Sequence, residues 1–167
     1  QENLINVQAK IDAALARRTE GKITGNKVTL VAVTKNHPAE VITDAFNLGV
    51  SVIGENRVQE AKAKREIVGK GSGRWHLIGH LQTNKAKQAV AIFDMIESAD
   101  SVHLMQAVDK EAAKAGKVQE ILLQVNIARE EQKTGFSPED YEAVVPELDN
   151  FKNLHVRGLM VIAPAAE

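Results

Sequence analysis

Short apolar segments rich in β-branched residues alternate with helical segments along this chain of 167 residues. Helical segments are recognised by apolar residues at helical spacing, and one of them, residues 2–18, precedes the first strand. No hairpin signal joins two successive strands. Strict alternation of this kind predicts an all-parallel sheet with right-handed crossovers, and therefore an α/β fold. The six predicted strands span residues 28–35, 50–54, 74–78, 95–98, 120–127 and 155–162.

The length of the chain limits how many strand–helix units it can hold. Each unit takes about 30 residues, so the chain holds about five and a half. A complete eight-unit barrel needs about 200–250 residues. We therefore expect one domain over residues 1–167, folded either as an open doubly wound sheet or as about three quarters of a TIM-type barrel.

Composition excludes several classes of function. The content of 44% hydrophobic and 26% charged residues is that of an ordinary globular protein. A net charge of −1 provides no basic surface, so we expect neither a nucleic-acid nor a membrane partner. Cysteine is absent, which excludes disulfides, thiolate metal sites and cysteine nucleophiles and fits a cytoplasmic location. No apolar run is long enough to cross a bilayer.

The first predicted strand ends in a lysine. Val31, Val33 and Lys35 share one side of the strand, and Pro38 soon ends it. A continuous apolar run of this kind indicates a strand covered on both faces. An amine kept partly desolvated there loses its proton more readily and can form a Schiff base with a carbonyl. A lysine extending into solvent from a strand end is the alternative, and the spacing alone leaves both open.

Polar side chains also follow the other predicted strands. Asn56 follows the second strand, His76 and His80 share a face of the third, and Asn126 and Met160 lie near the ends of the fifth and sixth. Since parallel strands end at one rim, we expect these residues to gather there. Asn56 as a helix cap and His76 as a hydrogen-bonded core histidine are the simpler readings. The two histidines lack a third ligand, so we expect no metal site.

Two glycines and a loop lysine belong to the same expected rim. Gly54 and Gly79 leave room for a flat ring or for a close backbone approach, with turn formation as the alternative. Lys133 lies in the loop after the fifth strand, where a flexible surface lysine is the simpler reading. The glycine-rich phosphate loop, G-x-S-x-G, H-E-x-x-H and G-x-G-x-x-G motifs are all absent from the sequence.

Four segments together resemble the pyridoxal-phosphate homeostasis protein family, whose members are single-domain relatives of the alanine racemase N-terminal barrel. The second and third, G-E-N-R-V-Q-E and W-H-L-I-G-H-L-Q-T-N-K, are specific because they fix many positions with uncommon residues. The resemblance extends from the first helix to the last residue. The four segments are Leu30–Lys35, Gly54–Glu60, Trp75–Lys85 and Arg157–Met160.

The resemblance implies a TIM-type (β/α)8 barrel of the alanine racemase N-terminal type, with about six of its units in this chain. It implies pyridoxal 5′-phosphate (PLP) as cofactor, held as a Schiff base on Lys35 with Asn56 beside it. It also implies a non-enzymatic role in cofactor supply, with apo PLP-dependent enzymes as possible recipients. Lys133 and Gly135 match a family loop discussed as a second cofactor site. His80 departs from the family pattern, which often has proline there.

The family continues for two further strand–helix units, which contain the segments that grip the phosphate. We expect residues 1–167 to lack these units and therefore to hold PLP weakly. Uncovered apolar surface would then favour self-association of an otherwise monomeric chain. Three alternatives stay open: a PLP-dependent amino-acid racemase, which needs a second acid/base group and normally another domain, a Schiff-base aldolase, and a chain that does not retain PLP.

Overall fold

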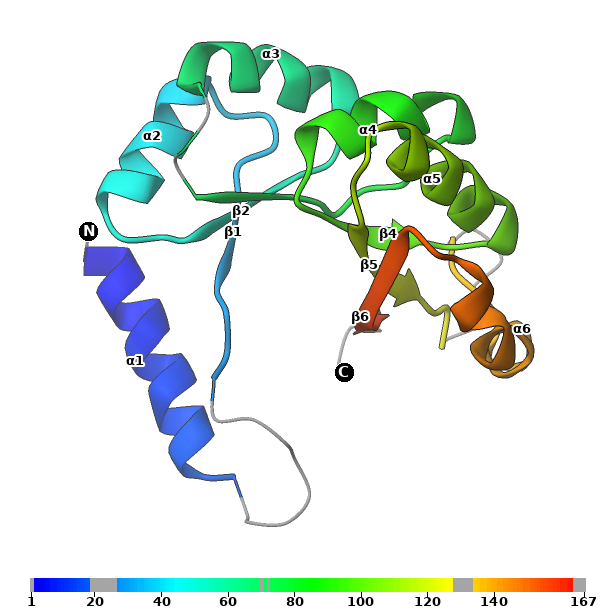
Figure 1. The fold of residues 1–167 in the computed structure, drawn as a ribbon. Coiled ribbons are helices and arrows are strands. Elements are labelled where there is room, and N and C mark those ends of the chain that lie inside the picture. Colours follow the sequence, from blue (N-terminus) through cyan, green and yellow to red (C-terminus); the bar gives the residue numbers. More distant parts are fainter. Residues whose placement is uncertain (1, 19–26, 70, 72, 128–133, 164–167) are drawn as a thin grey trace.

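The computed structural model describes residues 2–18, 27–69, 71, 73–127 and 134–163. Its centre is a six-stranded sheet in which every neighbouring pair is parallel and the strands follow chain order from β1 to β6 (Figure 1). This confirms the predicted alternation and the all-parallel sheet. The strands are β1 Val31–Val33, β2 Val52–Glu55, β3 Arg74–Leu77, β4 Met95–Ala99, β5 Gln119–Gln124 and β6 Leu154–Met160.

The helices occupy the intervals between the strands. Ser137 caps α6 by accepting a hydrogen bond from the Asp140 amide at 3.0 Å. Pro146 lies in a 3-10 helix that continues α6, because proline lacks the amide hydrogen that an α-helix needs. In the described part of the chain, no helix combines the length and apolarity needed to cross a membrane. The helices are α1 Glu2–Ala16, α2 Ala39–Asn47, α3 Val58–Val68, α4 Ala86–Ile92, α5 Val102–Lys114 and α6 Pro138–Val144, with 3-10 helices η1 Thr83–Lys85 and η2 Val145–Asn150.

The hydrophobic core lies between one face of the sheet and the helices that cover it, and α2 to α5 follow one another over this outer face (Figure 1). Side chains that alternate along each strand supply the sheet side of the core. Apolar positions three or four apart on the helices supply the other side. Core residues that are at most 1% exposed include Ile42, Ile53, Ala61, Trp75, Ala89, Ile96, Leu104, Ile121 and Leu123.

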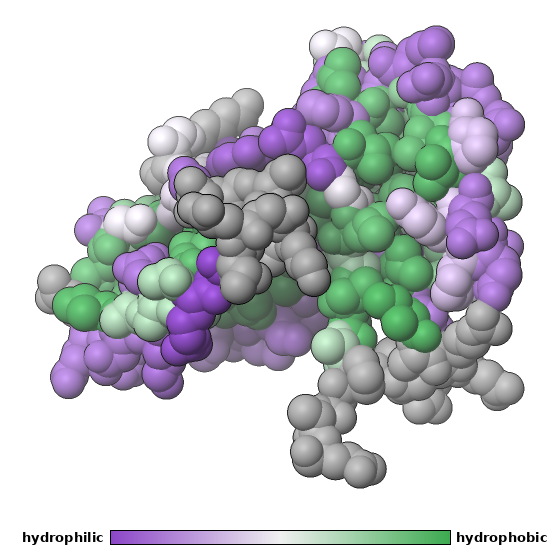
Figure 2. Space-filling model, turned by 90° about the horizontal axis from the view of Figure 1, so that it is seen from below, coloured by the Kyte–Doolittle hydropathy of each residue, from purple (hydrophilic) through white to green (hydrophobic). Residues whose placement is uncertain are grey.

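The opposite, inner face of the sheet is open in the described part of the chain. Val33 is 48% exposed and Ile162, just beyond β6, is 58% exposed. Viewed from below, the molecule presents a broad apolar surface (Figure 2). The expectation that the first strand is covered on both faces is therefore wrong here. Its neighbours are one sheet partner, β2, and the helices of the outer face.

Two strands are shorter by two residues or more than the sequence indicated. β1 covers Val31–Val33 rather than residues 28–35, and Lys35 lies in the turn that follows it. β5 ends at Gln124 rather than Ile127, because the chain then pairs locally with a later segment. The Phe136 amide donates to the Gln124 carbonyl at 2.8 Å, and the Asn126 amide donates to the Phe136 carbonyl at 2.9 Å.

Helix α1 does not cover the core, although its apolar residues have helical spacing. None of its residues is buried, and Ile5 is 62% exposed. The helix lies apart from α2 to α5, on the other side of the sheet in Figure 1. Its Leu4 and Leu15 border a hollow that also contains Leu30 and Val50, near the starts of β1 and β2. Periodicity identified an apolar helix face, but the contacts of that face depend on the tertiary structure.

Candidate functional site

The structure brings most of the predicted rim residues together around one hollow of about 550 Å³. The hollow lies on the inner side of the sheet, where the strands end. Gly54, His76 and Asn126 are not among its lining residues. The lining residues are Val31, Val33, Lys35, Asn56, Ile78, Gly79, His80, Glu97, Gln124, Thr134, Met160 and Ile162.

Lys35 lies at the mouth of this hollow and supplies its amine. The preceding residue, Thr34, is only 2% exposed, and its amide donates to the Gly54 carbonyl at 3.0 Å. The following residue, Asn36, has a φ of 62°, a left-handed conformation that asparagine tolerates better than most residues. Lys35 itself is exposed, so the predicted partial burial of its amine is not observed. The open inner face beside β1 accounts for this difference.

A buried charged cluster lies behind the Lys35 turn. The Lys64 ammonium, on α3, donates to the Thr34 carbonyl at 2.8 Å and to Glu55 Oε1 at 2.8 Å. It also lies 2.7 Å from Glu60 Oε1, one helical turn earlier. The Thr34 hydroxyl donates to Glu55 Oε1 at 2.6 Å. These contacts tie the ends of β1 and β2 to α3.

Asn56 and Gly79 show how the ends of β2 and β3 are brought together. Asn56 is half-buried and follows β2 directly. A Cβ atom at Gly79 would lie 2.4 Å from the Asn56 carbonyl oxygen, so this position requires glycine. A Cβ atom at Gly54 would lie 3.1 Å from side-chain atoms of Ile78 and Val31, a tighter space than usual. The predicted close backbone approach is therefore confirmed at Gly79.

The two histidines of the third strand segment make separate carboxylate pairs. His76 is 6% exposed, and its Nδ1 lies 2.6 Å from Glu97 Oε1. Its Nε2 is buried without a hydrogen-bond partner. His80 is exposed at the rim, with Nδ1 2.8 Å from Asp100 Oδ2. His76 is thus the hydrogen-bonded core histidine of the simpler reading. Among the described residues, no group of three or more such ligands is placed to hold a metal ion.

The family model for the N-terminal domain of alanine racemase matches residues 13–167 of this chain. A pyridoxal phosphate homeostasis protein from Aquifex aeolicus is 37% identical over 166 residues, which are 99% of this chain and 72% of that protein. The chain belongs to the pyridoxal phosphate homeostasis protein family. A pyridoxal phosphate homeostasis protein from Haemophilus influenzae is 32% identical to this chain, over 97% of this chain and 68% of that protein.

Solved structures agree with membership of this family. PipY of Synechococcus elongatus, solved with PLP bound, matches with a TM-score of 0.78 and 38% identity over 95% of this chain and 71% of that one. Alanine racemase of Clostridium difficile matches with a TM-score of 0.69 at 13% identity, over 93% of this chain and 40% of that one, which shows a shared fold alone. The predicted TIM-type fold of the alanine racemase N-terminal kind is confirmed.

Several polar residues that line the hollow were not predicted from the sequence. Glu97, Gln124 and Thr134 line the hollow, and the Gln124 amide nitrogen donates to the Thr134 carbonyl at 3.0 Å. Gln124 could have been found in the sequence, because it is a polar residue inside a largely apolar segment. Lys64 was missed because it forms an ordinary i, i+4 pair with Glu60 in the sequence. Lys133, a candidate second cofactor lysine, lies outside the described residues.

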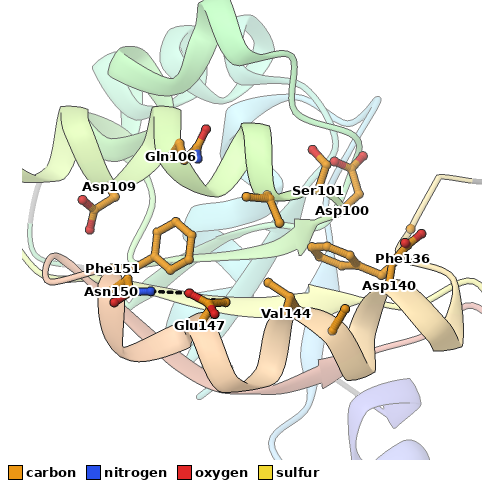
Figure 3. A pocket seen from close by; sticks show the side chains of 13 residues that line it. Asp100, Ser101, Gln106, Asp109, Phe136, Asp140, Val144, Glu147, Asn150 and Phe151 are labelled. Carbon is orange, nitrogen blue, oxygen red and sulfur yellow. Dashed lines mark hydrogen bonds between the residues drawn. The ribbon is translucent and has the colours of Figure 1, made fainter.

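A second cavity, of about 670 Å³, lies between α5 and the α6–η2 segment (Figure 3). Phe136, Val144 and Phe151 give it an apolar floor. Its acidic groups already have partners; Asp109, for example, accepts from the Asn153 amide at 2.7 Å. No lysine lines this cavity among the described residues, so it offers no amine to an aldehyde.

Proposed function

We propose that this chain binds PLP as a Schiff base on Lys35 and serves as a non-enzymatic store and supply of the cofactor. The observation that carries the proposal is the position of Lys35 and Asn56 on one hollow at the ends of parallel strands. That is the end of a barrel where ligands bind. Relatives at 31–37% identity are named for pyridoxal phosphate homeostasis, and PipY was solved with PLP bound.

The residues of the hollow suit an aromatic aldehyde. The unprotonated Lys35 amine attacks the aldehyde carbon, a C=N bond forms, and the aldehyde oxygen leaves as water. Val31, Ile78 and Met160 provide apolar walls for a flat ring, and Asn56 provides an amide for its polar substituents. The volume of about 550 Å³ is within the usual range for small-molecule sites.

A PLP enzyme needs an acid/base group that is free to act on substrate. Glu97 and His76 are instead paired with each other. We therefore favour delivery of cofactor to apo PLP-dependent enzymes over racemase activity.

The first test is titration with PLP, followed by borohydride reduction and peptide mass analysis. We expect an imine absorption band and a pyridoxyl label on Lys35, both lost in Lys35→Ala. Lys87→Ala removes an exposed lysine of α4 and should leave both unchanged. An unchanged band in Lys35→Ala would refute the proposed site.

The second test addresses what the bound cofactor does. The PLP-loaded protein, mixed with an apo PLP-dependent enzyme, should restore that enzyme's activity while its own imine band declines. The same preparation should leave L-alanine optically unchanged. Racemisation that depends on Lys35 would replace the supply role with the racemase alternative.

A further inference from the structure

Lys64 is a buried lysine that does not line the hollow. It is 6% exposed, and its side chain extends from α3 toward the ends of β1 and β2. A buried ammonium loses its hydration, and this cost must be offset by hydrogen bonds and opposite charge. An ammonium group has three protons to donate. Lys64 has three acceptors, at 2.7–2.8 Å: the Thr34 carbonyl, Glu55 and Glu60.

These acceptors hold the peptide groups on both sides of Lys35. The Thr34 carbonyl belongs to the peptide group before the Lys35 Cα, and it accepts from Lys64 at 2.8 Å. The Asn36 amide belongs to the peptide group after it, and it donates to Glu60 Oε1 at 2.7 Å. Glu60 is in turn held by Lys64 at 2.7 Å. The direction in which the Lys35 side chain leaves the backbone is therefore held by the Lys64 ammonium, together with the hydrogen bond from the Thr34 amide to the Gly54 carbonyl.

Both carboxylates of the cluster contact the Lys64 ammonium. The hydrogen bond from Lys64 is the main cause that lowers the pKa of Glu60, and the Asn36 amide adds to it while partial burial opposes it. Glu55 is fully buried, and its second oxygen, Oε2, has no partner. Loss of the ammonium would leave two acidic groups facing each other across the turn.

We propose that Lys64 is a positioning residue for Lys35: it fixes the turn so that the Lys35 amine faces the hollow and reacts with an aldehyde. This inference rests on the proposed function. A purely structural role would be met by an apolar side chain, since α3 already contributes Val58 and Ala61 to the core. A buried ion cluster is a costly way to gain stability alone. Its contacts to both peptide groups beside Lys35 point to positioning.

The experiment measures reaction of the protein with PLP in Lys64→Met and in Lys62→Met. Lys62 lies on the same helix with its side chain 60% exposed, and its ion-pair partner Glu66 is 4.0 Å away. We expect Lys64→Met to form the Lys35 imine about 10–100-fold more slowly, because small misplacement of a reacting group costs rate of this order. Lys62→Met should react at the wild-type rate.

The readout that separates positioning from stability is the ratio of pyridoxyl label on Lys35 to label on exposed lysines of the same molecules. Circular dichroism and denaturant unfolding first establish that the variant is folded. A folded Lys64→Met with the wild-type ratio and rate would overturn the proposal. Should Lys64→Met not fold, Glu60→Ala decides, because it removes the acceptor of the Asn36 amide and its side chain is 24% exposed. A wild-type ratio and rate in Glu60→Ala would likewise overturn it.

Failure of this inference differs from failure of the proposed function. If wild type itself gives no imine that depends on Lys35, the proposed function fails. If wild type gives that imine and Lys64→Met gives it equally fast, PLP binding stands and the positioning role fails.

Discussion

The two faces of the sheet contrast most clearly in two adjacent leucines of β5. Leu123 points into the helix-covered outer face and is 1% exposed. Leu122 points the other way and is half-buried, with its Cδ2 3.9 Å from where a Gly158 Cβ would be. The covered face holds the large buried residues of the core, whereas the open face holds the hollow with Lys35 and Asn56. Stability and candidate chemistry thus reside on opposite sides of the same strands.

The largest expected effect comes from truncating these two leucines. Leu123→Ala should lower the free energy of unfolding by about 2–5 kcal/mol, because it removes buried contacts and leaves a cavity. Leu122→Ala should cost less than half as much, since its side chain is already partly in water. Denaturant unfolding measures both. Equal losses would show that the inner face is packed as tightly as the outer one.

Glycine substitutions at the strand ends should rank next. Gly79→Ala places a methyl group 2.4 Å from the Asn56 carbonyl oxygen, and we expect a loss of about 1–3 kcal/mol from overpacking. Gly54→Ala is the matched control, since its new methyl group would meet side-chain atoms at 3.1 Å, which can shift slightly. Gly79→Ala should also weaken PLP binding by displacing Asn56. A Gly79→Ala protein as stable as wild type would contradict the close approach.

The charged cluster of Lys64, Glu55 and Glu60 predicts that the free energy of unfolding depends on pH. The pKa of Glu60 is lowered in the folded state, so its contribution is present above its unfolded pKa and is lost as pH falls through the folded pKa. Glu60→Gln should therefore cost about 1 kcal/mol at pH 7. The difference from wild type should shrink as pH falls below about 4.3, the ordinary pKa of a glutamate, and should be lost once the pH is below the lowered pKa of Glu60 in the folded state. Unfolding curves at several pH values measure it, and a difference that persists in acid would contradict the assignment.

The smallest effect on stability is expected at the exposed apolar surface. Leu159 is 51% exposed on β6, and Leu159→Lys should change the free energy of unfolding by less than about 0.5 kcal/mol. It should nevertheless reduce association of the protein with itself, since exposed apolar patches promote such contacts. Sedimentation velocity at increasing concentration compares the variant with wild type. If the variant and the wild type associate equally, the apolar surface around Leu159 is not what causes self-association.

The sequence predicted those features of the fold that depend on local pattern, and it did not predict those that depend on tertiary contacts. Alternation of short apolar runs with helical spacing predicted the six parallel strands, because local pattern determines where strands and helices form. It left the order of the strands open between a doubly wound sheet and a barrel, and only the family resemblance implied the barrel. It failed for α1, whose apolar spacing identified a face without identifying what that face contacts. The strand pattern left open whether Lys35 is partly buried or exposed, and the structure has it exposed.

The motifs placed Lys35 and Asn56 at one rim because the ends of parallel strands meet. The role of Lys64 was not predictable, since an i, i+4 pair with Glu60 is typical of a solvated helix surface. Its burial depends on how α3 lies across the ends of β1 and β2. This arrangement is a property of the folded chain rather than of any short segment.

The two outer strands of the sheet carry features that discourage uncontrolled strand pairing. β1 has three residues, so it offers few free backbone groups to a stray strand. β6 is longer, but its pairing with β5 shifts between Ile121 and Leu122, and it carries exposed Arg157 and His155. A strand that adds beside β6 must accommodate both the irregular register and the exposed side chain of Arg157, which is paired with Glu120.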